Sequence, residues 1–168
     1  MTELLSWLRR YKRIRGSLRL TSGQLYSHKK QKLKNALVAI VDDDVAVVRA
    51  AKRLLISRGI EATTFLSGTE FIDFIEQAPQ PVLDCIILDV HMDGVNGLDV
   101  QRYLVENGMT IPIVFISSAV EPWIRDQAIT AGAVAFFSKP FDPDAFIDSL
   151  EKLIASRRDG DAQLVSLK

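Results

Sequence analysis

The stretch "IILDVHMDGVNG" occupies residues 86–97 and guides the interpretation of the rest of the chain. An apolar run leads to a carboxylate, Asp89, a second carboxylate follows at Asp93, and two glycines follow at Gly94 and Gly97. An acid at the end of an apolar run has two explanations. It is either the first solvated residue after a buried strand, or a carboxylate held at the mouth of a reactive site. The residues around the stretch must decide between them.

The composition is that of a soluble globular domain of ordinary size with an appendage. The chain has 168 residues, of which 48% are hydrophobic and 25% are charged, and these proportions are ordinary for globular proteins. Cys85 is the only cysteine, so no disulfide forms within the chain and a reducing compartment, the cytoplasm, fits best. The sequence has neither a signal peptide at its start nor an apolar run of about 18 residues, so we expect no membrane-spanning segment.

Charge divides the chain into a basic arm and an acidic body. Residues 1–34 hold ten Lys or Arg and one acid, whereas the rest of the chain holds eleven bases and twenty acids. We therefore predict an N-terminal extension over 1–35, a domain over 36–158 and a short tail over 159–168. The arm has apolar residues at helical spacing among its bases. It could be a helix on an anionic membrane surface, a partner-binding helix, a nucleic-acid contact or a poorly ordered extension, and we favour the last.

The body alternates strand and helix signals five times. Short apolar or β-branched runs predict strands at 36–41, 60–66, 85–89, 111–117 and 133–138. Helical periodicity with capping residues and glycine stops predicts helices at 42–59, 67–78, 97–108, 121–132 and from 142 onward. Such alternation predicts an α/β fold with a parallel sheet covered by helices on both faces. In such sheets, ligands bind beyond the carboxyl ends of the strands.

Acids follow two of the predicted strands. Asp42, Asp43 and Asp44 come after the first strand, and Asp89 ends the third. If these strands are neighbours, the carboxylates crowd together and repel by about 4 kcal/mol per pair at an intermediate dielectric. Protonation or a bound cation relieves that repulsion, and Mg²⁺ suits a set of two or three carboxylates with water. For Asp44 taken alone, a helix cap is the commoner role.

The fourth and fifth strands add hydroxyls and a cation. Ser117 and Ser118 end the fourth strand, and Lys139 with Pro140 follows the fifth. Taken alone, the serines are ordinary helix caps, and a lysine at such an edge can extend into water. Together with the acids they supply the groups that phosphoryl transfer uses: a metal, a cation for the phosphate oxygens, a hydroxyl donor and a carboxylate nucleophile.

Together these motifs resemble the receiver domain of bacterial two-component response regulators. The residues that carry the resemblance are "VDDD" at 41–44, "ILDVHMDGVNGLD" at 87–99, "FISS" at 115–118 and "FFSKPF" at 136–141. The resemblance covers about residues 36–157. It implies a doubly wound, flavodoxin-like sheet of five parallel strands in the order 2-1-3-4-5, as in single-domain chemotaxis regulators.

The resemblance implies a role for each landmark residue. Asp89 is the phosphoacceptor, which takes a phosphoryl group from a sensor histidine kinase or a phosphotransfer protein. Mg²⁺ is held by Asp42, Asp43, Asp89 and the backbone carbonyl of His91. Lys139 pairs with the phosphoryl group. On this interpretation Asp89 ends an apolar strand because a nucleophile must be held rigidly with only its tip exposed.

The resemblance also assigns residues to the conformational switch that follows phosphorylation, and the chain departs from the family pattern at some positions. The resemblance implies that Ser117 moves toward the phosphoryl group, that Phe136 occupies the aromatic switch position and follows it inward, and that the Lys139–Pro140 peptide is cis. Asp93 replaces the usual proline, which brings a fourth acid toward the site. Ser117 replaces the commoner threonine, and Phe136 has no phenolic hydroxyl. No required group is lost, so we expect a competent receiver.

The predicted function is a phosphorelay signalling switch rather than an enzyme, with self-phosphorylation and self-dephosphorylation at Asp89 only. Because so few residues follow the last helix, we expect no DNA-binding domain and output through contact of the helices at 121–132 and from 142 with an unknown downstream protein. One alternative is a Mg²⁺-dependent phosphotransferase or phosphatase with an Asp nucleophile. It is disfavoured because no second acid stands two residues after Asp89 and no lid insertion encloses a substrate. Another alternative is a scaffold that works without phosphorylation.

Overall fold

The computed structural model describes residues 36–77, 83–118 and 121–165, with side chains as far as residue 158. Within these residues each predicted strand and helix is present. The strands are β1 Leu37–Val41, β2 Glu61–Phe65, β3 Cys85–Asp89, β4 Ile113–Ser117 and β5 Ala135–Ser138. The helices are α3 Val45–Ser57, α4 Gly68–Gln77, α5 Gly97–Glu106, α6 Pro122–Thr130 and α7 Pro143–Val165. The predicted basic extension lies outside the described residues.

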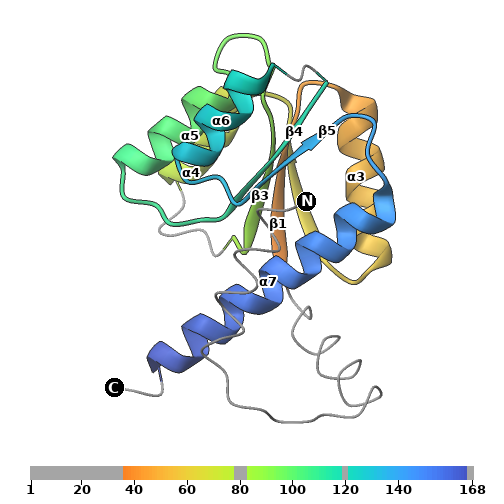
Figure 1. The fold of residues 1–168 in the computed structure, drawn as a ribbon, viewed down its shortest axis with the longest axis vertical. Coiled ribbons are helices and arrows are strands. Elements are labelled where there is room, and N and C mark those ends of the chain that lie inside the picture. Colours follow the sequence, from red (N-terminus) through yellow and green to blue (C-terminus); the bar gives the residue numbers. More distant parts are fainter. Residues whose placement is uncertain (1–35, 78–82, 119–120, 166–168) are drawn as a thin grey trace. The chain divides into compact units, whose positions relative to one another are not determined.

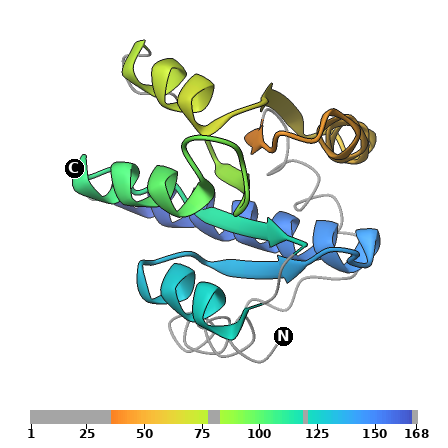
Figure 2. The ribbon, with the colours of Figure 1, turned by 90° about the horizontal axis from the view of Figure 1, so that it is seen from above.

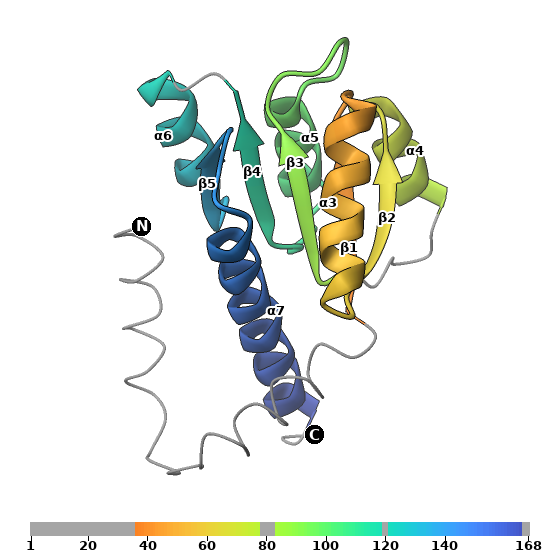
Figure 3. The same cartoon turned by 90° about the vertical axis from the view of Figure 1, so that its right-hand side faces the viewer.

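The five strands form one parallel sheet in the order β2-β1-β3-β4-β5, which confirms the predicted topology. α4, α5 and α6 cover one face of the sheet, and α3 and α7 cover the other (Figures 1, 2 and 3). β3 and β4 are buried along their whole length, as strands covered on both faces must be. The strand order reverses between β1 and β3, so the carboxyl ends of these two strands form the switch point where such folds bind ligands.

The core has two layers, one on each face of the sheet. Side chains alternate along β4, so that Phe115 packs toward α5 while Val114 and Ile116 pack toward α7. The large, fully buried side chains include Phe71, Phe115, Phe146, Leu55, Ile86, Ile87, Leu88 and Leu104. Each contributes roughly 1.5–3 kcal/mol by leaving water. These two layers fix the strands, and therefore the residues at the strand ends.

Side chains cap the beginnings of α3 and α4. Asp44 caps α3, since its Oδ1 accepts hydrogen bonds from the N–H groups of Ala46 at 2.7 Å and Val47 at 3.4 Å. Ser67 accepts from the N–H of Glu70, whose carboxylate accepts in turn from the N–H of Leu66. These caps satisfy backbone donors that a helix start leaves unpaired. Asp44 is thereby assigned to the helix end.

The last helix is longer than predicted. α7 continues to Val165 and so runs through most of the segment predicted as a short tail. Arg157 donates to the carbonyl of Leu83 at 2.9 Å, and Arg158 forms an ion pair with Asp84. Both contacts lie at the start of β3, and they fasten the helix to the amino end of the sheet. None of the helices in the described ranges is apolar over a length that crosses a bilayer.

Candidate functional site

Three carboxylates meet at the switch point of the sheet. Asp42 follows β1 and Asp89 ends β3, and the pairing of Val41 with Leu88 places these strand ends side by side. One oxygen from each of Asp42, Asp43 and Asp89 lies within 4.8 Å of the other two. Asp42 and Asp89 are buried, whereas Asp43 is exposed. The crowding predicted from the strand order is therefore present.

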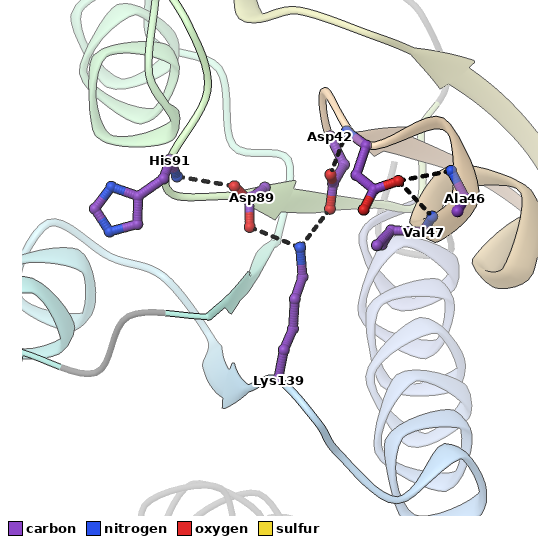
Figure 4. A network of polar contacts seen from close by, with 7 residues as sticks. Asp42, Ala46, Val47, Asp89, His91 and Lys139 are labelled. Atoms are coloured by element: carbon purple, nitrogen blue, oxygen red, sulfur yellow. Dashed lines mark hydrogen bonds and ion pairs between the residues drawn. The ribbon is translucent and has the colours of Figure 1, made fainter.

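Lys139 extends inward and bridges the two buried acids (Figure 4). Its Nζ donates to Asp42 Oδ2 at 2.7 Å and to Asp89 Oδ1 at 2.9 Å, and its side chain is 18% exposed. The N–H of Lys139 donates to the carbonyl of Ser117 at 2.7 Å, and the Lys139–Pro140 peptide is cis, as predicted. The lysine therefore offsets part of the charge of the acids instead of extending into water.

The remaining oxygens of the two buried acids are held by backbone groups. Asp42 Oδ1 accepts from the N–H of Asp44, and Asp89 Oδ2 accepts from the N–H of His91, both at 2.9 Å. Each donor lies two residues after its acceptor, so the loops after β1 and β3 fold back onto the carboxylates. Both carboxylates are thereby fixed before any ligand arrives, which is the preorganisation that reactive sites need.

Burial and charge act in opposite directions on the ionisable groups. Burial raises the pKa of Asp89, Lys139 opposes this, and the neighbouring Asp42 adds to it. Burial alone would lower the pKa of Lys139, but its hydrogen bonds to Asp42 and Asp89 outweigh that effect and raise it. Lys139 is therefore charged at neutral pH. When the three acids are ionised, they exceed the lysine by two negative charges, which one divalent cation would balance.

Ser117 lies at the same edge of the sheet as this cluster, and Phe136 lies on the neighbouring strand β5. Ser117 ends β4, the strand next to the one that carries Asp89. Its Oγ is completely buried, and among the described residues it has no hydrogen-bond partner. Phe136 is partly buried, with its ring centroid 6.1 Å from that of Phe115. A buried hydroxyl without a partner costs roughly 1–3 kcal/mol, so the Ser117 hydroxyl is an unused donor among the described residues.

Two of the predicted acids lie outside the cluster. Asp44 caps α3, and Asp93 is exposed and does not belong to the group of three gathered carboxylates. The expectation that Asp93 brings a fourth acid to the site is therefore not met. Asp93 lies in the loop after β3. The next residue, Gly94, has a φ of 77° and makes the turn in this loop.

The sequence also matches a known family. Residues 38–151 match the model of the response regulator receiver domain. The chain belongs to this family. It is 38% identical over 138 residues to the response regulator protein TmoT of Ectopseudomonas mendocina, a match that covers 80% of this chain and 61% of TmoT. The crystal structure of a response regulator receiver protein from Burkholderia phymatum is 42% identical with a TM-score of 0.65, covering 71% of this chain and 95% of that one.

The relatives correct one prediction about partners. The expectation of no DNA-binding domain, which rested on the short tail, is wrong. The chain spans 61% of TmoT and 52% of TdiR of Thauera aromatica, which is 32% identical over 122 residues and is named a transcriptional regulatory protein. A receiver is a folding unit of its own. Its last helix therefore carries no information about further domains.

Proposed function

We propose that this receiver accepts a phosphoryl group on Asp89 from a sensor histidine kinase, and that Mg²⁺ assists the transfer. One observation carries the proposal: Lys139 bridges Asp42 and Asp89, with Asp43 in reach of both. Family membership supports the same chemistry. The proposed location is the cytoplasm, where a buried free thiol such as that of Cys85 stays reduced.

In the proposed reaction, a carboxylate oxygen of Asp89 attacks the phosphorus of a phosphohistidine. The new O–P bond makes an acyl phosphate, the P–N bond breaks, and its electron pair leaves with the imidazole nitrogen. Backbone and side-chain hydrogen bonds already hold both oxygens of Asp89, so the nucleophile needs little reorientation. The attack uses the carboxylate form, which the charge on Lys139 favours.

The residues around Asp89 could balance the negative charge of a phosphoryl group transferred to it. Asp42, Asp43 and Asp89 would hold Mg²⁺, as would the carbonyl of His91, whose part stays a prediction. When bound, the metal would offset the charge on the phosphoryl oxygens. Lys139 lies 2.9 Å from Asp89 Oδ1 and so would meet the phosphoryl group where it forms.

Ser117 and Phe136 would report the modification. The unpartnered hydroxyl of Ser117 can donate to a phosphoryl oxygen, and its movement would leave room toward which the ring of Phe136 can turn. Such a step would bias an equilibrium between two arrangements of the protein, as phosphorylation switches do.

The test is incubation of the full chain with acetyl phosphate and Mg²⁺, followed by intact-mass measurement. We expect one added phosphoryl group on the parent and none on Asp89→Asn, because an amide forms no acyl phosphate. Asp93→Asn is the matched control, since it removes an exposed acid from the same loop, and it should label like the parent. Labelling of Asp89→Asn would place the nucleophile elsewhere. Turnover of an organic phosphate would instead indicate an enzyme, and an unmodified parent would indicate a scaffold.

A further inference from the structure

α6 is held on the sheet by few attachments. Two of its side chains, Ile124 and Ala128, are buried. The residue before it, Glu121, makes no side-chain capping hydrogen bond, and Trp123 in its first turn is 61% exposed. A helix this short is not stable by itself, so its position depends on tertiary contacts. Any additional contact to α6 therefore contributes substantially to its position on the sheet.

The carboxyl end of α6 has such a contact. The helix closes with the N–H of Ala133 donating to the carbonyl of Ala128 and the N–H of Gly132 donating to that of Ile129, each at 3.0 Å, with Gly132 at a φ of 101°. The carbonyl of Ala128 also accepts a hydrogen bond from outside the helix. Gln101 of α5 reaches it through Nε2 at 2.9 Å, and Gln101 is 2% exposed. One buried amide thus joins the end of α6 to α5.

The other end of this connection lies at the phosphoacceptor. α5 begins at Gly97, which packs so closely on the backbone of Asp89 that a Cβ there would lie 2.1 Å from the Asp89 carbonyl oxygen. The N–H of Gly97 also donates to the carbonyl of Val90 at 3.0 Å. Gln101 is four residues further on and so lies on the same side of the helix, one turn away. α5 therefore spans from the backbone of Asp89 to the end of α6.

The contact with Ala128 also lies just before the strand that carries the switch residues. Ala133 is buried, and Val134 donates through its N–H to the carbonyl of Ile113 as the chain enters β5. β5 holds Phe136 and leads to Lys139. A shift of α6 beyond the reach of the Gln101 side chain would therefore break this hydrogen bond or move α5 with it.

We infer that Gln101 is a positioning residue that couples occupation of the Asp89 site to the placement of α6. The inference rests on the proposed function and adds to it a connection separate from Ser117 and Phe136. The hydrogen bond is present with Lys139 still bridging Asp42 and Asp89, the arrangement without a phosphoryl group. We take this bond to be lost when the site is occupied, so that removing the donor weakens only the arrangement without a phosphoryl group. By linkage, a phosphoryl mimic should then bind more tightly.

The experiment compares two full-chain variants that each remove one hydrogen bond from α5 to a neighbouring helix. Gln101→Met removes the bond to α6 with nearly the same side-chain volume. Tyr103→Phe is the matched control, because it removes the bond of 2.9 Å between the Tyr103 hydroxyl and Glu76 of α4. Beryllofluoride with Mg²⁺ serves as the phosphoryl mimic, and its binding midpoint is measured by calorimetry. Amide hydrogen exchange of residues 121–133 is measured without the mimic.

For Gln101→Met we expect faster exchange in α6 and a midpoint about fivefold lower, the factor that one ordinary hydrogen bond gives. Tyr103→Phe should change neither quantity. Gln101→Leu, which also lacks a side-chain donor and introduces no charge at this buried position, should act in the same direction and serves if the Met variant folds poorly. Unchanged exchange in α6, or an equal midpoint shift in Tyr103→Phe, would overturn the inference. A parent that binds no beryllofluoride would overturn the proposed function, whereas equal binding by parent and Gln101→Met overturns the coupling alone.

Discussion

β3 has a buried aspartate at each end, and the two are held in different ways. Asp84 precedes the strand at the amino end of the sheet, and Asp89 ends the strand at the carboxyl end. Arg158 binds Asp84 through Nε at 2.7 Å and Nη2 at 2.8 Å, and the N–H of Leu37 donates to the same carboxylate at 2.9 Å. Asp89 receives one hydrogen bond from Lys139 and one from the backbone.

The choice of cation separates a structural acid from a reactive one. The guanidinium of Arg158 grips both oxygens of Asp84 in a planar fork, a geometry specific to a carboxylate, and this hydrogen bonding raises the pKa of the arginine. The pair joins α7, β3 and the start of β1. Lys139 is a compact charge shared between Asp42 and Asp89, so it can move to a new oxygen without losing a fixed geometry. One acid is committed to the fold, and the other remains available.

The largest expected effect is on the amino end. Asp84→Ala should lower the free energy of unfolding by about 3–5 kcal/mol, because it removes both hydrogen bonds to Arg158 and the acceptor of the Leu37 N–H. Urea denaturation measures the change. Asp144→Ala is the control: it removes a pair with Arg58 in which the aspartate side chain is 85% exposed, and should cost less than about 1 kcal/mol. Equal losses in the two variants would mean that Asp84 is not a structural anchor.

The second largest effect is stabilisation by Mg²⁺, which should depend on the acids at the carboxyl end of the sheet and not on Asp84 at the amino end. At a concentration a hundredfold above its Kd, Mg²⁺ should stabilise the parent by about 2.7 kcal/mol, since it binds the folded state. Asp43→Ala should cancel the gain, because Asp43 is one of the three gathered carboxylates. Asp84→Ala should keep the gain in full on its lower baseline. Thermal unfolding with and without Mg²⁺ is the measurement, and a parent insensitive to the metal would remove the metal site.

Asp89→Asn should change stability in the opposite direction to Asp84→Ala. Burial raises the pKa of Asp89, so its carboxyl group contributes stability below the pKa of the unfolded chain and loses it as the pH rises through the folded pKa. A neutral amide avoids that loss. Without Mg²⁺ we expect a gain in the free energy of unfolding at pH 7 that is smaller than the gain from Mg²⁺ and that disappears below about pH 4, where aspartate is protonated in both states. Urea denaturation across this pH range measures the change. Destabilisation by Asp89→Asn at pH 7 would show that Asp89, like Asp84, stabilises the fold.

The smallest expected effect concerns the hydroxyl beside Asp89. Ser117→Ala should raise the free energy of unfolding by on the order of 0.5 kcal/mol, because it removes a buried donor that has no partner among the described residues. Ser118→Ala, at the exposed neighbouring position, should leave stability unchanged. Chemical denaturation without phosphoryl donor or mimic is the measurement. A loss of stability in Ser117→Ala would indicate that the hydroxyl is already bonded in the unmodified protein.

The sequence predicted the reactive end of the sheet far better than the structural end. Asp42, Asp89 and Lys139 each follow an apolar strand, and parallel strands bring their carboxyl ends to one edge, so local patterns were sufficient. The pairing of Asp84 with Arg158 joins positions 74 residues apart and has no local signal. Gln101 was detectable in principle, as a polar residue on the buried side of its helix, but its acceptor is a backbone carbonyl that no pattern identifies. The length of α7 was missed because "RRDGDAQ" reads as polar tail.

Because α7 is attached to the receiver near both of its ends, it could hold a fused protein in a defined orientation. Pro143 begins α7 at the carboxyl edge of the sheet, and Arg157 and Arg158 bind residues at the amino edge. These contacts fix the direction of the helix axis and the rotation of α7 about that axis. Each residue inserted between Arg158 and Val165 would advance whatever is fused beyond by about 1.5 Å and turn it by about 100°. A fluorescent reporter attached in this way could be aimed in steps, and its energy transfer to a dye on the sheet would vary with a period of about 3.6 insertions.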